Sequence, residues 1–117
     1  NLAKDLEAEA MDIGLDVLIE THNKEEMENA LSMKSELVGV NNRNLNDFTV
    51  NIDNTISLTS ASVSEKIYVS ESGIRSRSDI NYILDKSPAR TFLVGESLMR
   101  SEKIEEQIRT LLSSWLI

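Results

Sequence analysis

The chain alternates between short runs of apolar residues and longer segments in which apolar residues recur every three or four positions. The short runs predict strands that are buried on both faces, and the longer periodicity predicts amphipathic helices. This order, a helix followed by four strand–helix units, predicts a parallel α/β sheet with right-handed crossovers. Strands are expected over residues 16–20, 37–41, 66–70 and 91–95, and helices over residues 1–13, 24–33 and 54–61, after Ser76, and from about Ser101.

Polar residues at the expected helix starts support these boundaries. Asn23 with Glu26, and Ser76 with Asp79, have the spacing of a capping box, in which a side chain at each position bonds to the backbone of the other. Asp53 is expected to cap the third helix. The last helix is expected to carry an apolar stripe of Ile104, Ile108, Leu111, Leu112 and Trp115.

Two architectures fit this order: an open, doubly wound sheet, and half of a (β/α)₈ barrel, whose usual length of about 250 residues is roughly twice this chain. Every predicted strand ends in polar or charged residues, whereas in an open sheet only the strands at the switch point carry ligand groups. The first helix also has almost no lead-in. Its apolar face is formed by Leu2, Ala3, Leu6 and Ala10. Both features favour a half-barrel cut from a longer chain.

Composition narrows the classes of partner. The net charge of −8 argues against nucleic acid or an anionic membrane, because both require a basic surface. No apolar run approaches the roughly 20 residues of a membrane span, and no signal peptide is visible, so the expected location is the cytoplasm. The chain has no cysteine, and its single histidine, His22, forms no metal constellation and is expected to cap a helix or face water.

Functional side chains follow the first three predicted strands. Glu20 and Glu71 are candidates for proton transfer, because two carboxylates that face one cleft can differ in pKa; a salt bridge or exposure to water is the alternative for each. Asn41 and Arg43 are expected to point the same way, with Asn42 opposite and structural. Arg43 is suited to clamping a carboxylate or phosphate through two hydrogen bonds.

Two turns that contain glycine predict an anion site. Ser72 and Gly73 follow the third strand, and Gly95 and Glu96 follow the fourth. Small residues let backbone N–H groups approach a phosphate closely, and barrel enzymes often hold a phosphate between the loops after strands 7 and 8. A glycine after a strand is also common in an ordinary turn, so the residues alone leave both readings open.

Four motifs together resemble indole-3-glycerol phosphate synthase. They occur in the order found in that family, and the likeness covers essentially the whole chain but only the last half of the enzyme. The resemblance implies the C-terminal half of a (β/α)₈ TIM barrel, with strands 5–8 and helices 4–8. The motifs are LIETH over 18–22, GVNNRNL over 39–45, VSESGI over 69–74 and LVGESLM over 93–99.

The resemblance also implies a reaction and a set of roles. The family closes the ring of 1-(o-carboxyphenylamino)-1-deoxyribulose 5-phosphate, with loss of CO₂ and water, in tryptophan biosynthesis, and no metal or organic cofactor is implied. By motif position Glu20 matches a general base, Asn41 an amide that orients the substrate, and Glu71 a carboxylate of the active site. The residues that match substrate and phosphate contacts are Arg43, Ser72, Gly73, Gly95 and Glu96, the last through its backbone N–H.

The chain departs from the family pattern in three ways. Asn44 stands where Asp is common, and residues 85–90 lack the Gly that usually follows the seventh helix. The larger departure is that the Lys that acts as general acid in the family, and a further Glu and Lys, would lie upstream of Asn1. Ring closure needs a proton donor near the carbonyl. We therefore expect the 117-residue chain alone to be inactive, although it can keep a phosphate site.

Half a barrel exposes two strand edges, which tend to pair, so we expect either a homodimer or association with the missing half. Three other readings remain. The first is a different phosphate-binding barrel, such as phosphoribosylanthranilate isomerase, which lacks an equivalent of Asn41-Asn42-Arg43. The second is a non-catalytic, open α/β binding module of the flavodoxin type, and the third is a half-barrel with no retained function.

Overall fold

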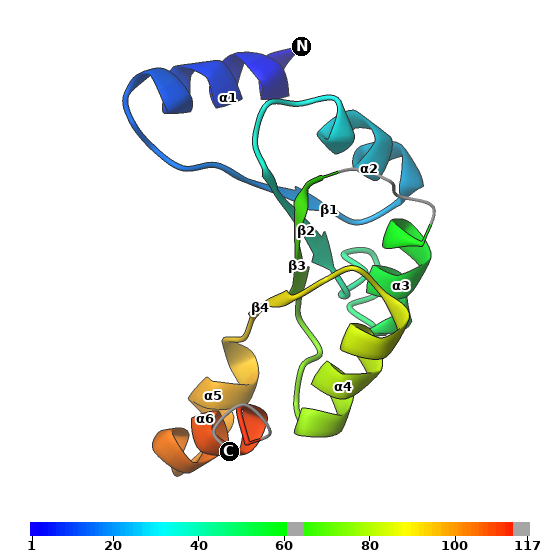
Figure 1. Cartoon of the computed structure of the whole chain (residues 1–117), viewed down its shortest axis with the longest axis vertical. Coiled ribbons are helices and arrows are strands. Elements are labelled where there is room, and N and C mark those ends of the chain that lie inside the picture. The colour runs from blue at the N-terminus through cyan, green and yellow to red at the C-terminus, as the bar shows by residue number, and fades with distance from the viewer. Residues whose placement is uncertain (61–64, 114–117) are drawn as a thin grey trace.

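The computed structural model describes residues 1–60 and 65–113, which form a four-stranded sheet with helices packed along it (Figure 1). All neighbouring strands run parallel. The helices are α1 (Leu2–Asp12), α2 (Lys24–Leu31), α3 (Asp53–Thr59), α4 (Arg77–Lys86), α5 (Glu96–Arg100) and α6 (Ile104–Leu111), and the strands are β1 (Leu18–Thr21), β2 (Leu37–Asn41), β3 (Ile67–Glu71) and β4 (Thr91–Leu93).

The order of the strands decides between the two predicted architectures. The sheet runs β1-β2-β3-β4, so each strand pairs with the next strand along the chain. A doubly wound sheet reverses direction at a switch point and places helices on both faces. Here α2, α3 and α4 all lie on one side of a curved sheet (Figure 1). The arrangement is an arc of a (β/α) barrel, as predicted, and it excludes the open, flavodoxin-like module.

The two faces of the sheet have different environments. Side chains alternate along a strand, and in β2 the side chains of Val38 and Val40 point toward the helices, where both are fully buried. They pack in the core with residues of α2, β3 and α4. On the opposite face Leu18, Ile67 and Leu93 are 41%, 44% and 53% exposed. The hydrophobic core therefore lies between sheet and helices, and the inner face of the arc is open.

Helix α1 is held by a carboxylate, although its pattern predicted an apolar contact face. Leu2 and Leu6 are exposed, and no described element covers them, whereas Glu7 is buried. The Glu7 carboxylate accepts hydrogen bonds from the backbone N–H groups of Lys34 (3.0 Å) and Ser35 (2.7 Å). These bonds fix α1 to the segment that leads into β2, at the end of the sheet away from the predicted site.

Several predicted features need correction. Ser76 and Asp79 form the predicted capping box. Asn23 is the N-cap of α2, but the Glu26 side chain accepts from the Asn23 side-chain amide rather than from its backbone N–H, so only half of that predicted capping box forms.

Asp53 does not cap α3 but is its first residue, and its N–H donates to the Asn51 side chain instead. The predicted last helix corresponds to α6, which begins at Ile104 rather than near Ser101. The short helix α5, directly after Gly95, was not predicted. Trp115, assigned to its apolar stripe, lies outside the described residues. No helix within the described residues has the length and apolarity to cross a membrane.

The Glu7 contacts predict an acid-sensitive contribution to stability. Burial opposes ionisation of Glu7, but the N–H donors of Lys34 and Ser35 and the charges of Lys66 and Lys34 outweigh it, so its pKa is lowered. A lowered pKa stabilises the fold above the unfolded-state pKa, and this contribution is lost as pH falls through the folded-state pKa. We expect Glu7→Gln to reduce the free energy of unfolding by about 1–3 kcal/mol at pH 7, measured by urea denaturation.

Glu9→Gln is the matched control, because Glu9 is on the same helix but exposed. It should leave the urea midpoint nearly unchanged both at pH 7 and at acid pH. The difference between the parent protein and Glu7→Gln should shrink at acid pH, and a difference that stays constant with pH would contradict the assigned role.

Candidate functional site

The carboxyl ends of the strands meet at one edge of the sheet, as the sequence predicted. A cavity of about 460 Å³ is lined there by Glu20 from β1 and Glu71 from β3, together with Arg43. The predicted phosphate-binding turns, Ser72–Gly73 and Gly95–Glu96, line the same cavity. Seven of the eight predicted site residues therefore share one cavity. The eighth, Asn41, is 9% exposed and is hydrogen-bonded to His22, which follows β1, and to the N–H of Arg43.

Glu71 and Glu20 form a pair of carboxylates on the inner face of the sheet. Glu71 is 4% exposed, and its buried Oε2 atom has no hydrogen-bond partner among the described residues. Its side chain occupies the space above Gly39 on the neighbouring strand, where a Cβ atom would collide with Oε2. Burial, the charge of Glu20 and a hydrogen bond to Glu20 raise the pKa of Glu71 to about 7, against a smaller opposing effect of His22. At neutral pH Glu71 can therefore either give or accept a proton.

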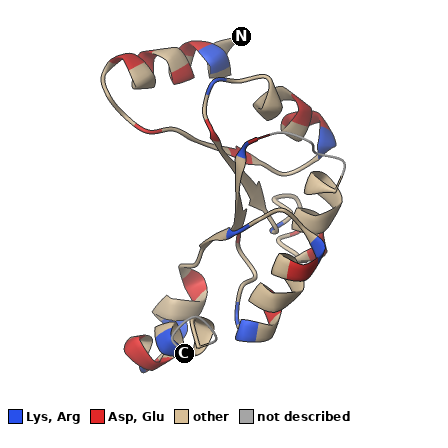
Figure 2. Ribbon diagram, in the orientation of Figure 1, with Lys and Arg blue, Asp and Glu red and all other residues tan. Residues whose placement is uncertain are grey.

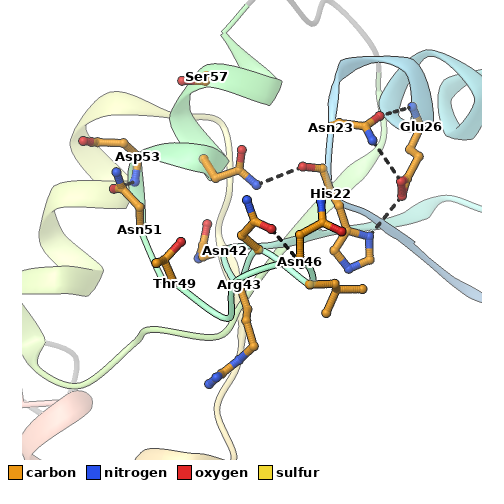
Figure 3. A pocket seen from close by; sticks show the side chains of 13 residues that line it. His22, Asn23, Glu26, Asn42, Arg43, Asn46, Thr49, Asn51, Asp53 and Ser57 are labelled. Atoms are coloured by element: carbon orange, nitrogen blue, oxygen red, sulfur yellow. Dashed lines mark hydrogen bonds and ion pairs between the residues drawn. The ribbon is translucent and has the colours of Figure 1, made fainter.

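His22, which the sequence analysis assigned to capping or solvent, is instead a central contact of the site. Its side chain is 21% exposed and lies between two carboxylates. Nε2 is 3.1 Å from Oε2 of Glu20, and Nδ1 is 3.0 Å from Oε1 of Glu26. The spacing of four residues between His22 and Glu26 across a helix start was the available sequence signal, since such a spacing allows side chains to meet. Figure 3 shows the contact with Glu26.

The carboxyl end of β2 and the residues after it have different roles: Asn42 is structural, as predicted, Arg43 lines the cavity, and Asn41 is bonded to Arg43 and His22. Asn42 is 3% exposed, and its side chain bonds to Ser70, Ser72 and Thr55. Asn41 accepts a hydrogen bond from the N–H of Arg43 (2.9 Å) through Oδ1. Asn42 thus holds β2, β3 and α3 together beneath the site, and the Asn41–Arg43 bond fixes the turn that carries the guanidinium.

The two glycine turns differ in what they require. Ser72 and Gly73 both have positive φ angles of 68° and 79°, and a Cβ at Gly73 would collide with Cγ1 of Val50. Gly73 is therefore needed for conformation and for space. Gly95 has open space around the position of a Cβ, and it precedes the first residue of α5. Gly95 thus keeps the backbone accessible from the cavity without being required by packing.

The Glu96 side chain is neutralised by two arginines. Its carboxylate is 2.7 Å from Nη2 of Arg43 and 2.9 Å from Nη2 of Arg100. The Arg43 contact joins the loop after β2 to the turn after β4, across the mouth of the cavity. A carboxylate next to an anion site would repel its ligand, and these two ion pairs reduce that repulsion.

Comparison with known proteins decides the family. The family model described as indole-3-glycerol phosphate synthase matches residues 1–111. The chain belongs to the indole-3-glycerol phosphate synthase family. It is 50% identical over 101 residues to the enzyme of that name from Polynucleobacter necessarius, 43% identical over 112 residues to the one from Zymomonas mobilis, and 44% identical over 107 residues to the one from Burkholderia cenocepacia.

These matches cover 86%, 96% and 92% of this chain, but only 38%, 42% and 41% of the relatives. The chain therefore spans about two fifths of the length of the curated relatives that it matches. The match to the synthase family favours it over phosphoribosylanthranilate isomerase, in agreement with Asn41, Asn42 and Arg43 after β2.

Positive charge near the site comes from a few arginines rather than from the chain as a whole. Acidic residues outnumber Lys and Arg by 20 to 12, and the basic residues are scattered over the ribbon (Figure 2). A second cavity of about 470 Å³ adjoins the first and is lined by Arg43, Arg75 and Arg100. The net negative charge of the chain repels anions. Binding of an anion at this edge would therefore depend on the nearby guanidinium and backbone N–H groups. The described residues contain no group of three His, Asp or Glu side chains placed to hold a metal ion.

The carboxylate pair predicts a specific change in titration. We expect Glu20→Gln to lower the pKa of Glu71 from about 7 toward its usual value of 4.5, because the variant removes the neighbouring negative charge. The measurement is the ¹³C shift of the Glu71 carboxyl carbon as a function of pH.

The raised pKa of Glu71 also predicts a dependence of stability on pH. The free energy of unfolding should fall as pH rises from about 4.5 to about 7, and Glu71→Gln should remove that dependence.

The control for this titration is Glu28→Gln, which removes an equal charge from an exposed position on α2. It should leave the Glu71 midpoint in place. A Glu71 midpoint that is the same in Glu20→Gln and in the parent protein would show that the two carboxylates do not interact.

Proposed function

We propose that this chain supplies one part of an indole-3-glycerol phosphate synthase active site: the phosphate-binding turns and two of the carboxylates. The reaction is the ring closure of 1-(o-carboxyphenylamino)-1-deoxyribulose 5-phosphate with loss of CO₂ and water, a lyase step of tryptophan biosynthesis in the cytoplasm. The observation that carries the proposal is the cavity in which Glu20, Glu71 and both glycine turns meet. Family membership supports the choice of reaction.

In this proposal the substrate phosphate lies against the two turns. Both turns line the cavity, so the N–H groups around Gly73 and Gly95 are the proposed donors to the phosphate, and Ser72 adds a hydroxyl donor. The N–H of Glu96 contributes at the first residue of α5, while its carboxylate stays paired to Arg43. Arg43 then has a second role, because a guanidinium that bridges two loops can also bind an anionic group of the substrate.

The two carboxylates have complementary roles in proton transfer. Glu20 is 44% exposed at the end of β1 and acts as the general base in the dehydration step. Glu71, with a pKa of about 7, holds a proton for part of the time and can return it to the substrate. Asn41, fixed by its bond to the N–H of Arg43, orients the substrate through its amide.

Ring closure also needs an acid at the carbonyl that is attacked, and none of the described residues that line the cavity is a lysine. The family's Lys, together with a further Glu and Lys, would come from the portion of the barrel that this chain does not include. We therefore propose that the 117-residue chain alone lacks turnover, although its phosphate site is complete.

Phosphate binding tests the first half of the proposal. Titration with inorganic phosphate should produce saturable shifts in the backbone amide signals of Gly73 and Gly95, observed by ¹H–¹⁵N NMR, and no turnover should be detectable. The matched control is Gly14, whose amide is distant from the cavity and should not shift. Shifts that avoid both turns would contradict the phosphate assignment, and measurable turnover by the chain alone would contradict the inactive state.

Restored catalysis tests the second half. Addition of a polypeptide carrying the portion of the Polynucleobacter relative that this chain does not match should produce turnover. In that mixture Glu20→Gln should lower the rate by about 10²–10⁴-fold, the usual contribution of a general base. Glu25→Gln, on the exposed side of α2, is the control. A rate equal for Glu20→Gln and Glu25→Gln would exclude Glu20 as the base.

We further propose that isolated chains pair through the open arc. β1 and β4 each have one unpaired edge among the described strands, and Leu18, Ile67 and Leu93 are exposed on the inner face. Unpaired edges and exposed apolar residues both favour association. Sedimentation should show a homodimer at micromolar concentration, and Leu93→Lys, which places a charge on the inner face, should shift it to monomer. A parent chain that sediments as a monomer would contradict the proposal.

A further inference from the structure

His22 lies between the start of α2 and two of the proposed catalytic side chains. Its Nδ1 atom faces Glu26 at 3.0 Å. Its Nε2 atom faces Oε2 of Glu20 at 3.1 Å and Nδ2 of Asn41 at 3.3 Å. The imidazole therefore contacts both groups that the proposed function assigns to proton transfer and substrate orientation on β1 and β2.

The side of the ring that faces α2 is fixed by the helix itself. Asn23 is the N-cap of α2, and its Oδ1 accepts a hydrogen bond from the N–H of Glu26 at 2.9 Å. The amide of Asn23 also donates to Oε2 of Glu26 at 3.3 Å, so the carboxylate is held from one side by Asn23 and from the other by His22 (Figure 3). Because Glu26 accepts from Nδ1–H, the proton on Nδ1 is fixed, as is the orientation of the ring.

The Nε2 atom, on the other side of the ring, contacts Glu20 and Asn41. When Nε2 carries a proton, it donates to the Glu20 carboxylate. When Nε2 carries none, it accepts from the Asn41 amide, whose own Oδ1 is already bonded to the N–H of Arg43. In both forms Nε2 holds a group that the proposed reaction uses. A base whose orientation depends on a neighbour that is itself anchored is the logic of catalytic triads.

We propose that His22 is a positioning residue of the synthase site, which transmits the fixed geometry of the α2 start, through Glu26, to Glu20 and Asn41. This inference rests on the proposed function, because that function is what makes the positions of Glu20 and Asn41 matter. It assigns no direct contact between His22 and the substrate. The effect of the His22 charge on Glu71, opposite to that of Glu20, is a further sign that the imidazole acts on the carboxylate pair.

A purely structural role for His22 makes a different prediction from a positioning role. A residue that only joined β1 to α2 would change stability and leave the environment of Asn41 and the titration of Glu71 as they are. A positioning residue changes both, even where the fold is intact. Both properties can be measured in the 117-residue chain without substrate, so the result does not depend on whether the proposed reaction occurs.

The test compares three variants by NMR: His22→Gln, Glu26→Gln and the control Glu25→Gln, which removes the same charge one residue away, from an exposed position. We expect His22→Gln to move the titration midpoint of the Glu71 carboxyl carbon upward from about 7, because the opposing effect of His22 is lost. We expect both His22→Gln and Glu26→Gln to shift the side-chain amide signals of Asn41, and Glu25→Gln to change neither signal.

The inference is overturned if His22→Gln retains the dispersed amide spectrum of the parent and leaves both the Glu71 midpoint and the Asn41 amide signals in place. If His22→Gln does not fold, Glu26→Gln decides, because it keeps the imidazole and removes only its anchor. Unchanged Asn41 signals in Glu26→Gln would then overturn the inference, and shifted signals would support it. If the reconstituted parent enzyme shows no turnover while the NMR signals change as expected, that result counts against the proposed function alone.

Discussion

The site depends on one buried side chain, that of Asn42. Its amide donates to Oγ of Ser70 in β3 and to the carbonyl of Ser72, while its Oδ1 accepts from the N–H and hydroxyl of Thr55 in α3. Its backbone is also used, because the N–H donates to the carbonyl of Glu71 and the carbonyl accepts from Asn51. A buried amide that satisfies all its hydrogen bonds specifies a single arrangement of the elements that it joins. One residue thus sets the relation of β2, β3, α3 and the first glycine turn.

Two kinds of support surround the cavity as a result. On the side of β3 the support is buried and hydrogen-bonded, through Asn42 and its partners. On the side of β1 and β4 it is ionic and partly exposed, through His22 with its two carboxylates and through Glu96 with its two arginines. Ion pairs near the surface contribute little to stability but can fix geometry. The buried, hydrogen-bonded side carries the Ser72–Gly73 turn and Glu71, and the ion-paired side carries Glu20 and Arg43.

The sequence was a good guide to elements and a poorer guide to long-range contacts. The bounds of β2 and the capping box at Ser76 follow from local rules, and they were predicted as observed. So was the meeting of Glu20 and Glu71, since all parallel strands end at one edge. Periodicity could not tell which face of α1 makes contact, because the neighbour that buries Glu7 is 27 residues away in sequence. The spacing of four residues could have indicated the contact of His22 with Glu26, but the contact of His22 with Asn41, 19 residues away, could not be read from the sequence.

Gly39 has a consequence for the neighbouring strand. The space for the Glu71 carboxylate exists only because the adjacent position on β2 has no side chain. Any side chain at position 39 would expel the carboxylate, and loss of the carboxylate would leave a void over the glycine. Residues 39 and 71, 32 positions apart along the chain, are therefore sterically coupled, and the size of the side chain at position 39 limits what position 71 can hold.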